Sequence, residues 1–301
     1  MFKFKLKKEQ ELLLSEETDL NTRFKDFLRN FKKQKTAVVA FFVLVILVFI
    51  AIFCYVIAPY GINEYNYSAT LQTPSLQHFF GTDEFGRDIF SRVLCGTRIS
   101  LSIGFLTVTI ATVIGTVLGL FAGYYGGLFD SVLMRVMDVM YAFPGLILAI
   151  AIVAILGPGL ANAAIAIVIF CIPTYTRLVR SCTLQLKNSV YVRAARCLGA
   201  SDARMLFKHI LPGAIPDIIV QYSLSVSGSI MTTASLSFLG MGAMSPTPEW
   251  GLMLSNSRTF FYSSWHYALF PGLAIVITVL CFNLLGDGLR MALDPKLSER
   301  S

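Results

Sequence analysis

The sequence is poor in charge: Lys, Arg, Asp and Glu make up 14% of its 301 residues. Soluble domains carry roughly a quarter charged residues. Hydrophobic residues make up 55% of the chain, which is more apolar surface than a soluble core can hide. The composition therefore excludes an ordinary soluble protein and indicates a chain whose surface meets the hydrocarbon of a membrane.

The sequence also lacks the motifs of ATP-binding, metal-binding and catalytic sites. No Gly-Lys pair occurs, so the chain lacks the P-loop that holds the phosphates of ATP, and any energy from ATP must come through another subunit. Six cysteines stand apart without C-x-x-C spacing and predict neither a disulfide nor a metal site. The histidines His78, His209 and His266 fall outside the apolar runs, which leaves an intramembrane enzyme without a base at membrane depth.

In place of charge, the sequence has long runs without Asp, Glu, Lys or Arg. A run of 22 residues at about 1.5 Å per residue spans roughly 33 Å, enough to cross a hydrocarbon core of about 30 Å. The longest run is interrupted by the turn signal Gly157-Pro158-Gly159 and predicts two helices. The sequence thus predicts an all-α integral membrane protein with about six transmembrane helices, in the runs Ala37–Ala58, Ile99–Ala122, Val139–Thr176 (two helices), Ile218–Gly240 and Tyr267–Gly286.

The positions of Lys and Arg predict the orientation, because positively charged loops stay in the cytoplasm. With the N-terminus inside, residues 1–36, the loop 177–217 and the C-terminal tail hold twenty Lys and Arg, against four in the outer loops. Both ends are therefore expected in the cytoplasm, and the net charge of +7 reflects topology rather than a nucleic-acid partner. Thirty-six mixed-charge residues precede the first apolar run, so no cleavable signal peptide is expected.

This topology divides the chain into four segments. Residues 1–36 form a cytoplasmic N-terminal segment, and 37–98 hold the first transmembrane helix and a periplasmic loop. Residues 99–290 form a core of five transmembrane helices with a cytoplasmic loop at 187–213, and 291–301 form a cytoplasmic tail.

Small and polar residues mark two of the predicted spans. Gly115, Gly119 and Gly123 recur every fourth residue, which predicts a helix face that packs closely against another membrane helix. The run SLSVSGSIMTTASLSF, within Ile218–Gly240, is rich in hydroxyl groups. At membrane depth such groups either bond across helices or line an aqueous path, and the sequence leaves both open.

The cytoplasmic loop reads KNSVYVRAARCLGASDARMLFKHILPG and predicts two short helices joined at Gly199. Glycine can adopt the left-handed conformation that ends a helix. Ser201 is a suitable N-cap for the second helix, with Asp202 favourable in its first turn. Pro212 is expected to stop the second helix before the next span begins. The position of the loop between two transmembrane helices disfavours the alternative of a DNA-binding helix-turn-helix.

The loop resembles the cytoplasmic signature of permease subunits of ABC importers, in which E-A-A is followed by glycine and later by Leu-Pro. The resemblance implies coupling helices that dock on an ATPase subunit. The sequence departs from the family at Arg193, where the family has glutamate. The residues to which the resemblance gives a coupling role are Arg193, Ala194, Ala195, Gly199, Ala200, Ser201, Asp202, His209, Leu211 and Pro212.

Other stretches, among them GTDEFGRDIFSRVLCGTRISL, AFPGLILA, SFLGMG, PTPEWG and NLLGDGLRMALDPK, resemble the second permease of dipeptide and oligopeptide importers, and within that branch glutathione-importing permeases. The resemblance implies a type I importer permease fold in the bacterial inner membrane. The implied partners are a sister permease, two ATPases that bind ATP and magnesium, and a periplasmic solute-binding protein, with no cofactor on this chain. Alternatives are a permease for nickel chelates or another small solute, and a stand-alone secondary transporter, although the uncharged runs offer that transporter no ion-coupling site.

Two predicted periplasmic segments hold further candidates. GTDEFGRD contains Asp83, Gly86, Arg87 and Asp88, which form either a solvated surface turn or a contact for the binding protein or the translocation mouth. PTPEWG contains Pro248, Glu249 and Trp250. Because tryptophan favours the membrane interface, this segment is predicted to be an anchor in the aromatic belt, or alternatively an external gate.

Overall fold

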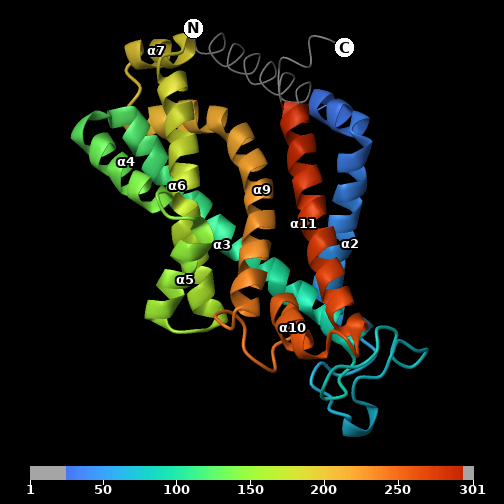
Figure 1. Cartoon of the computed structure of the whole chain (residues 1–301). Helices are drawn as coiled ribbons and strands as arrows, with labels where there is room; N and C mark the ends of the chain where they lie inside the picture. Colours follow the sequence, from blue (N-terminus) through green and yellow to red (C-terminus); the bar gives the residue numbers. More distant parts are fainter. Residues whose placement is uncertain (1–24, 294–301) are drawn as a thin grey trace.

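A computed structural model describes residues 25–293, and the regular structure in this part of the chain is helical (Figure 1). Residues 25–33 are helical and lead into α2. The larger helices that follow are α2 (Lys35–Ile57), α3 (Ile89–Tyr125), α4 (Gly127–Tyr141), α5 (Gly145–Leu156), α6 (Leu160–Lys187), α9 (Leu211–Phe238), α10 (Trp250–Ser257) and α11 (Trp265–Leu293). The short elements α7 (Val190–Cys197), α8 (Asp202–Arg204) and η2 (Met205–Ile210) join α6 to α9 at one end of the bundle, here called the α7 end (Figure 1). The opposite end, here the α10 end, carries α10 and the segment 59–88.

Four helices, α2, α3, α6 and α11, are long and apolar enough to cross a membrane, and the bent pair of α4 and α5 adds a fifth candidate. The remaining predicted span coincides with α9, which has 28 residues but is less apolar because of its many Ser and Thr residues. The integral membrane fold is therefore confirmed, while a total of six spans and the cytoplasmic position of both ends stay predictions.

The break at Gly157-Pro158-Gly159 is confirmed, since α5 ends at Leu156 and α6 begins at Leu160. The prediction of one helix between Val139 and this break is wrong, because the chain bends there. Helix α4 begins earlier, at Gly127, and meets α5 at an angle of 92°. Pro144 stands at the bend, where it has no N–H to donate and disfavours helical conformation in the residue before it.

Helix α6 also differs from its prediction, because it runs to Lys187 and so shortens the loop that was expected to begin at residue 177. Its Arg180 binds Asp130 of α4 through Nε and Nη2, at 2.5 and 2.6 Å. Arg177 binds Asp138 of α4 at 2.5 Å. Cations continue a membrane helix where they have partners, so these ion pairs explain how α6 extends past the uncharged run.

Helix α3 crosses the bundle obliquely and connects its two ends (Figure 1). At about 1.5 Å per residue, its 37 residues span roughly 55 Å, far more than the hydrocarbon core. The helix starts ten residues before the predicted run, so the predicted segment boundary between residues 98 and 99 falls inside it.

The glycines of α3 lie against α6. A Cβ atom on Gly115 would lie 2.5 Å from Cβ of Tyr175, and one on Gly119 would lie 2.6 Å from the carbonyl oxygen of Thr176. On Gly123 it would lie 2.7 Å from Cβ of Thr183. The two backbones are thus in direct contact along three turns, on the face that the glycine spacing predicts.

We predict that Gly119→Ala lowers the thermal stability of the purified protein. The new methyl group meets backbone and Val179 rather than flexible side-chain ends, and overpacking of this kind costs about 1–3 kcal/mol. Gly228→Ala in α9 is the matched control, because nothing lies within 4 Å of its Cβ position, and alanine favours a helix over glycine by about 1 kcal/mol. Equal unfolding temperatures for the two variants would contradict the close contact of α3 and α6.

Candidate functional site

The loop at the α7 end is a folded unit that rests on the membrane helices. Val192 of α7 and Met205, Leu206 and Ile210 of η2 are buried. They pack in one cluster with Leu120 and Tyr124 of α3 and Val179 of α6. Because the cluster joins three parts of the chain, the loop is fixed to α3 and α6 as well as to α9, into which it continues.

Polar contacts strengthen this attachment. The hydroxyl group of Tyr124 donates a hydrogen bond to Oδ1 of Asp202 at 2.5 Å. The ammonium group of Lys187 donates to the carbonyl oxygen of Tyr124 and lies 5.5 Å from the centre of its ring. Within the loop, the hydroxyl group of Tyr191 donates to the carbonyl oxygen of His209 at 3.2 Å. Tyr124 therefore connects the end of α3 with Lys187, at the end of α6, and with Asp202, in the second half of the loop.

The other side of the loop faces outward. Leu198 is 89% exposed, Val190 77% and Phe207 51%. The cations on this side are also exposed: Arg193, Arg196, Arg204 and Lys208. None of the four forms an ion pair with another residue of the described range 25–293. Large exposed apolar side chains that share a surface with exposed polar groups are typical of a surface that another protein covers.

The structure divides the predicted coupling residues between these two sides. Ala194 and Gly199 are exposed, whereas Ala195, Ala200 and Leu211 pack against the buried cluster. Gly199 has φ of +83°, the left-handed conformation that its position between two helices requires.

The second half of the loop departs from its prediction. Ser201 has the extended conformation of an N-cap, but its side chain makes no capping hydrogen bond. Pro212 does not end the second helix: α8, the π-helical η2 and α9 follow one another without a break, and Pro212 stands in the first turn of α9. A proline has no N–H to donate inside a continuous helix, and the π-helical turn of η2 lies just before it.

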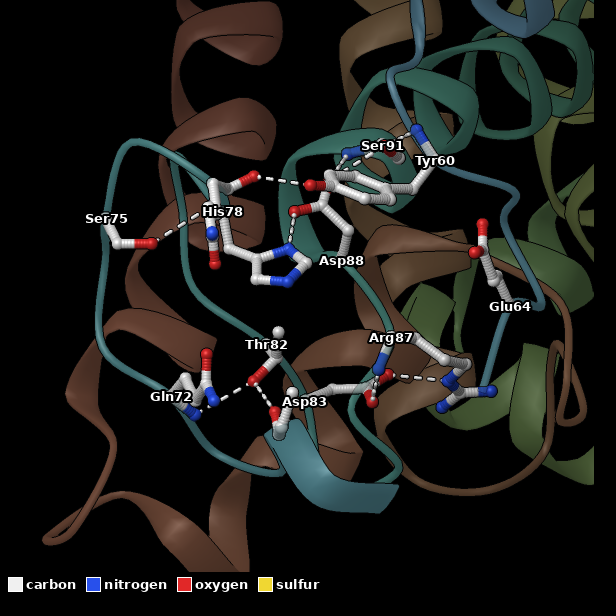
Figure 2. Close-up of polar contacts among 12 residues, drawn as sticks. Tyr60, Glu64, Gln72, Ser75, His78, Thr82, Asp83, Arg87, Asp88 and Ser91 are labelled. Atoms are coloured by element: carbon white, nitrogen blue, oxygen red, sulfur yellow. Dashed lines mark hydrogen bonds and ion pairs between the residues drawn. The ribbon is translucent and has the colours of Figure 1, made fainter. Parts of the chain in front are cut away.

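At the α10 end, the acidic and basic residues of GTDEFGRD form a buried cluster (Figure 2). Nε of Arg87 donates to Oδ2 of Asp83 at 2.7 Å, and Oδ1 of Asp83 accepts from the backbone amides of Phe85 and Arg87 at 2.9 Å. Both side chains are fully buried, and the guanidinium carbon of Arg87 lies 4.7 Å from the ring centre of Phe85.

Asp88 caps helix α3 in the same segment. Its Oδ2 accepts from the backbone amide and the hydroxyl group of Ser91, both at 2.7 Å, and its Oδ1 lies 2.9 Å from Nδ1 of His78 (Figure 2). Gly86 is buried too, with φ of +72°. A solvated turn does not fit these buried side chains, so that interpretation is corrected, while a contact of the segment with the binding protein or the translocation mouth stays a prediction. The charges of the buried side chains hold the segment 59–88 together.

The belt-anchor interpretation of PTPEWG is also wrong, because Trp250 is fully buried and its Nε1 donates to the carbonyl oxygen of Val93 at 3.0 Å. Glu249 caps α10 by accepting from the amides of Gly251 and Leu252, at 3.0 and 2.8 Å. Burial raises the pKa of Glu249, and these two amides oppose the rise. Pro248 is buried beside them. A role for this segment as an external gate stays a prediction.

The fold and the loop together define a class: a polytopic membrane protein whose helices carry an anchored helix–glycine–helix unit at one end. The family model described as "binding-protein-dependent transport system inner membrane component" matches residues 115–299, and that of the "N-terminal TM domain of oligopeptide transport permease C" matches residues 22–74. The chain belongs to the family of inner-membrane components of binding-protein-dependent transport systems.

Curated relatives agree with this assignment. The "glutathione transport system permease protein GsiD" of Escherichia coli O6:K15:H31 (strain 536 / UPEC) is 51% identical over 279 residues, which cover 92% of each chain. The protein of the same name from Salmonella typhimurium (strain LT2) is 52% identical over the same shares. As a member of this family the chain is a multi-pass transport subunit of the inner membrane and not an enzyme.

Solved structures share the fold. A chain of the inward-facing MetNI methionine ABC transporter superposes with a TM-score of 0.55 at 19% identity, over 68% of this chain and 98% of that one. A chain of an amino acid ABC transporter solved with histidines has a TM-score of 0.50 at 17% identity, over 67% and 94%. The fold is that of an ABC importer permease.

We predict that Tyr124→Phe loosens the loop without unfolding the bundle. A hydrogen bond to a charged acceptor contributes about 1.5–3 kcal/mol, so amide hydrogens of residues 190–210 should exchange faster with deuterium in the variant. Tyr125→Phe is the control, since the neighbouring Tyr125 is 55% exposed and lies outside the cluster. Equal exchange in the two variants would show that the bond to Asp202 does not hold the loop.

A second prediction concerns the charge cluster of Figure 2. Asp83→Asn removes the carboxylate nearest to the buried guanidinium of Arg87, at 2.7 Å, and leaves only Glu84 at 3.8 Å; loss of one partner of a buried pair costs about 3–5 kcal/mol. The purified variant should unfold at a clearly lower temperature. Glu64→Gln, an exposed acid-to-amide change in the same segment, should have little effect. A stable Asp83→Asn variant would contradict the structural role of the pair.

Proposed function

We propose that this chain is the permease subunit through which an ATP-driven importer moves small peptides, glutathione among them, from the periplasm to the cytoplasm. The observation that carries the proposal is the loop at the α7 end, which is anchored on one side and open on the other. Its relatives support the substrate class, because proteins at 51% and 52% identity over 92% of the chain are named as glutathione transport permeases.

In this proposal the outward side of the loop is the docking surface for an ATPase subunit. Leu198 and Val190 enter an apolar groove of the ATPase, and the surrounding cations meet acidic residues on its rim. Arg193 is exposed and therefore contacts the ATPase directly, with a charge opposite to that of the family's glutamate. Two such ATPases bind ATP and magnesium, one on this chain and one on a sister permease.

The contacts of the loop explain how ATPase movement reaches the membrane. The loop continues into α9, packs on α3 and α6, and is bonded to Tyr124. A displacement of the docking surface therefore moves the ends of three long helices together. The α7 end lies in the cytoplasm, as the distribution of Lys and Arg predicts. A solute-binding protein delivers the solute at the α10 end.

We predict that Leu198→Asp abolishes ATP-driven uptake of glutathione. A carboxylate in place of an apolar side chain that is 89% exposed should not affect folding, but it should prevent the ATPase subunits from copurifying with the permease. Tyr262→Asp is the matched control, since Tyr262 is exposed in the connection between α10 and α11 and its substitution should leave copurification unchanged.

The readouts are copurification of the ATPases and uptake of labelled glutathione by vesicles that contain the whole importer. Normal copurification with Leu198→Asp would contradict the docking surface. A wild-type importer that couples ATP hydrolysis to other solutes but imports no glutathione would retain the permease function and reject this substrate.

A further inference from the structure

The hydroxyl groups of α9 serve two different faces of the helix. On the buried face, Ser223 donates to the carbonyl oxygen of Phe282 in α11 at 3.0 Å, and Ser229 lies 2.7 Å from the hydroxyl group of Thr107 in α3. Ser227 donates to Oδ1 of Asn283 in α11 at 2.7 Å. This half of the helix therefore bonds across to its neighbours.

The side of α9 that other described helices do not cover carries a second polar row, here called the hydrophilic stripe. Steps of three and four residues place its members on one side of the helix, and none of them is buried in the chain. From first to last the stripe covers roughly 27 Å at about 1.5 Å per residue, close to the thickness of the hydrocarbon core. It consists of Asp217, Gln221, Ser225, Gly228, Thr232 and Ser235.

Most side chains of the stripe bond within α9. Thr232 and Ser235 donate to the carbonyl oxygens of Gly228 and Met231 in their own helix, both at 2.9 Å, and Nε2 of Gln221 donates to Oγ of Ser225 at 3.1 Å. Nothing lies within 4 Å of a Cβ built on Gly228. The described part of the chain therefore leaves the middle of the stripe uncovered.

A buried hydroxyl group next to the hydrophilic stripe indicates that the stripe is hydrated. Tyr175 of α6 is fully buried, and its hydroxyl group has no hydrogen-bond partner among the described residues. Its polar neighbours are Ser225 of the stripe and Thr112 of α3, whose hydroxyl group also lacks a partner. Buried polar groups are nearly always hydrogen-bonded. A water molecule beside Ser225 provides the missing partner.

Lipid does not fit this face, because unsatisfied polar groups are costly in hydrocarbon. The chain shows elsewhere what a lipid-facing surface looks like: α2 exposes Val45, Ile46, Phe49 and Ile52, and α11 exposes Leu273, Val276, Ile277 and Leu280. The polar face of α9 differs from both.

We infer that the hydrophilic stripe lines the aqueous route of the transported solute, and that Gln221 and Ser225 hydrogen-bond the amide and carboxylate groups of a peptide as it passes. These two side chains are neutral and can both donate and accept, which matches peptide groups without binding one charged end tightly. The inference rests on the proposed function, since it takes the solute to be a small peptide.

The test compares cysteine variants in the intact importer, with both permeases and the ATPases reconstituted in vesicles. Ser225→Cys and Thr232→Cys lie on the stripe, while Ser229→Cys is the same change one turn away on the buried face. A membrane-impermeant, negatively charged methanethiosulfonate is added, and labelling is read by mass in the tryptic segment between Lys208 and Arg258, which contains no native cysteine.

We expect both stripe variants to be labelled, Ser229→Cys to remain unlabelled, and S-methylglutathione, whose blocked thiol cannot consume the reagent, to slow the labelling of Ser225→Cys. Absence of labelling at both stripe positions in vesicles that import glutathione would overturn the inference, as would equal labelling of Ser229→Cys. Labelling that occurs only after the permease pair is dissociated would also overturn it, because the stripe would then be a subunit contact. Labelled stripe variants in vesicles that import no glutathione would support the aqueous route and count against the proposed substrate alone.

Discussion

The close approach of the α3 backbone to its neighbours is the constraint on which the rest of the structure depends. At Gly96 a Cβ atom would lie 2.7 Å from the ring of Trp250, and at Gly104 it would lie 2.8 Å from Ile230 of α9. Further along, α3 meets α6. The glycines at these contacts are Gly96, Gly104, Gly115, Gly119 and Gly123. One helix therefore touches α10, α9 and α6 in turn, and its position fixes theirs, because tight packing leaves little room to slide.

The two ends of α3 are held by polar contacts outside the uncharged part of the helix. Asp88 caps its first turn at 2.7 Å from the amide of Ser91, next to the buried pair of Asp83 and Arg87. Tyr124 binds Asp202 at its last turn. The charged groups thus lie at the two ends of α3, where other residues pair with them, and the apolar middle of the helix is held by packing alone. A helix held at both ends and packed along its length moves as one body, so the docking loop and the α10 end are mechanically connected.

Features that depend on spacing along one helix were predictable, and those that depend on the meeting of several segments were not. The glycine row and the break after Leu156 follow from local periodicity and turn chemistry. The 92° bend between α4 and α5 was missed because apolar composition predicts that a segment lies in the membrane but not the angle between successive helices. The burial of Asp83 and Arg87 was missed because a charged, glycine-containing segment reads as solvated until the packing of Phe85 and Tyr65 around the guanidinium is seen.

Helix α9 shows why the sequence left two roles open for its hydroxyl groups. Serine stands at every second position from Ser223 to Ser229, so the sequence does not tell which of these hydroxyl groups are buried. Only the positions of α3 and α11 show that Ser225 belongs to the uncovered side and the other three to the buried side. The same helix is the direct continuation of the docking loop through η2. A displacement of the loop therefore reaches the hydrophilic stripe through one continuous helix, while the buried face, bonded to α3 and α11, resists it. Under the proposed function, the polar asymmetry of α9 puts the side chains inferred to meet the solute on the helix that follows the proposed docking surface most directly.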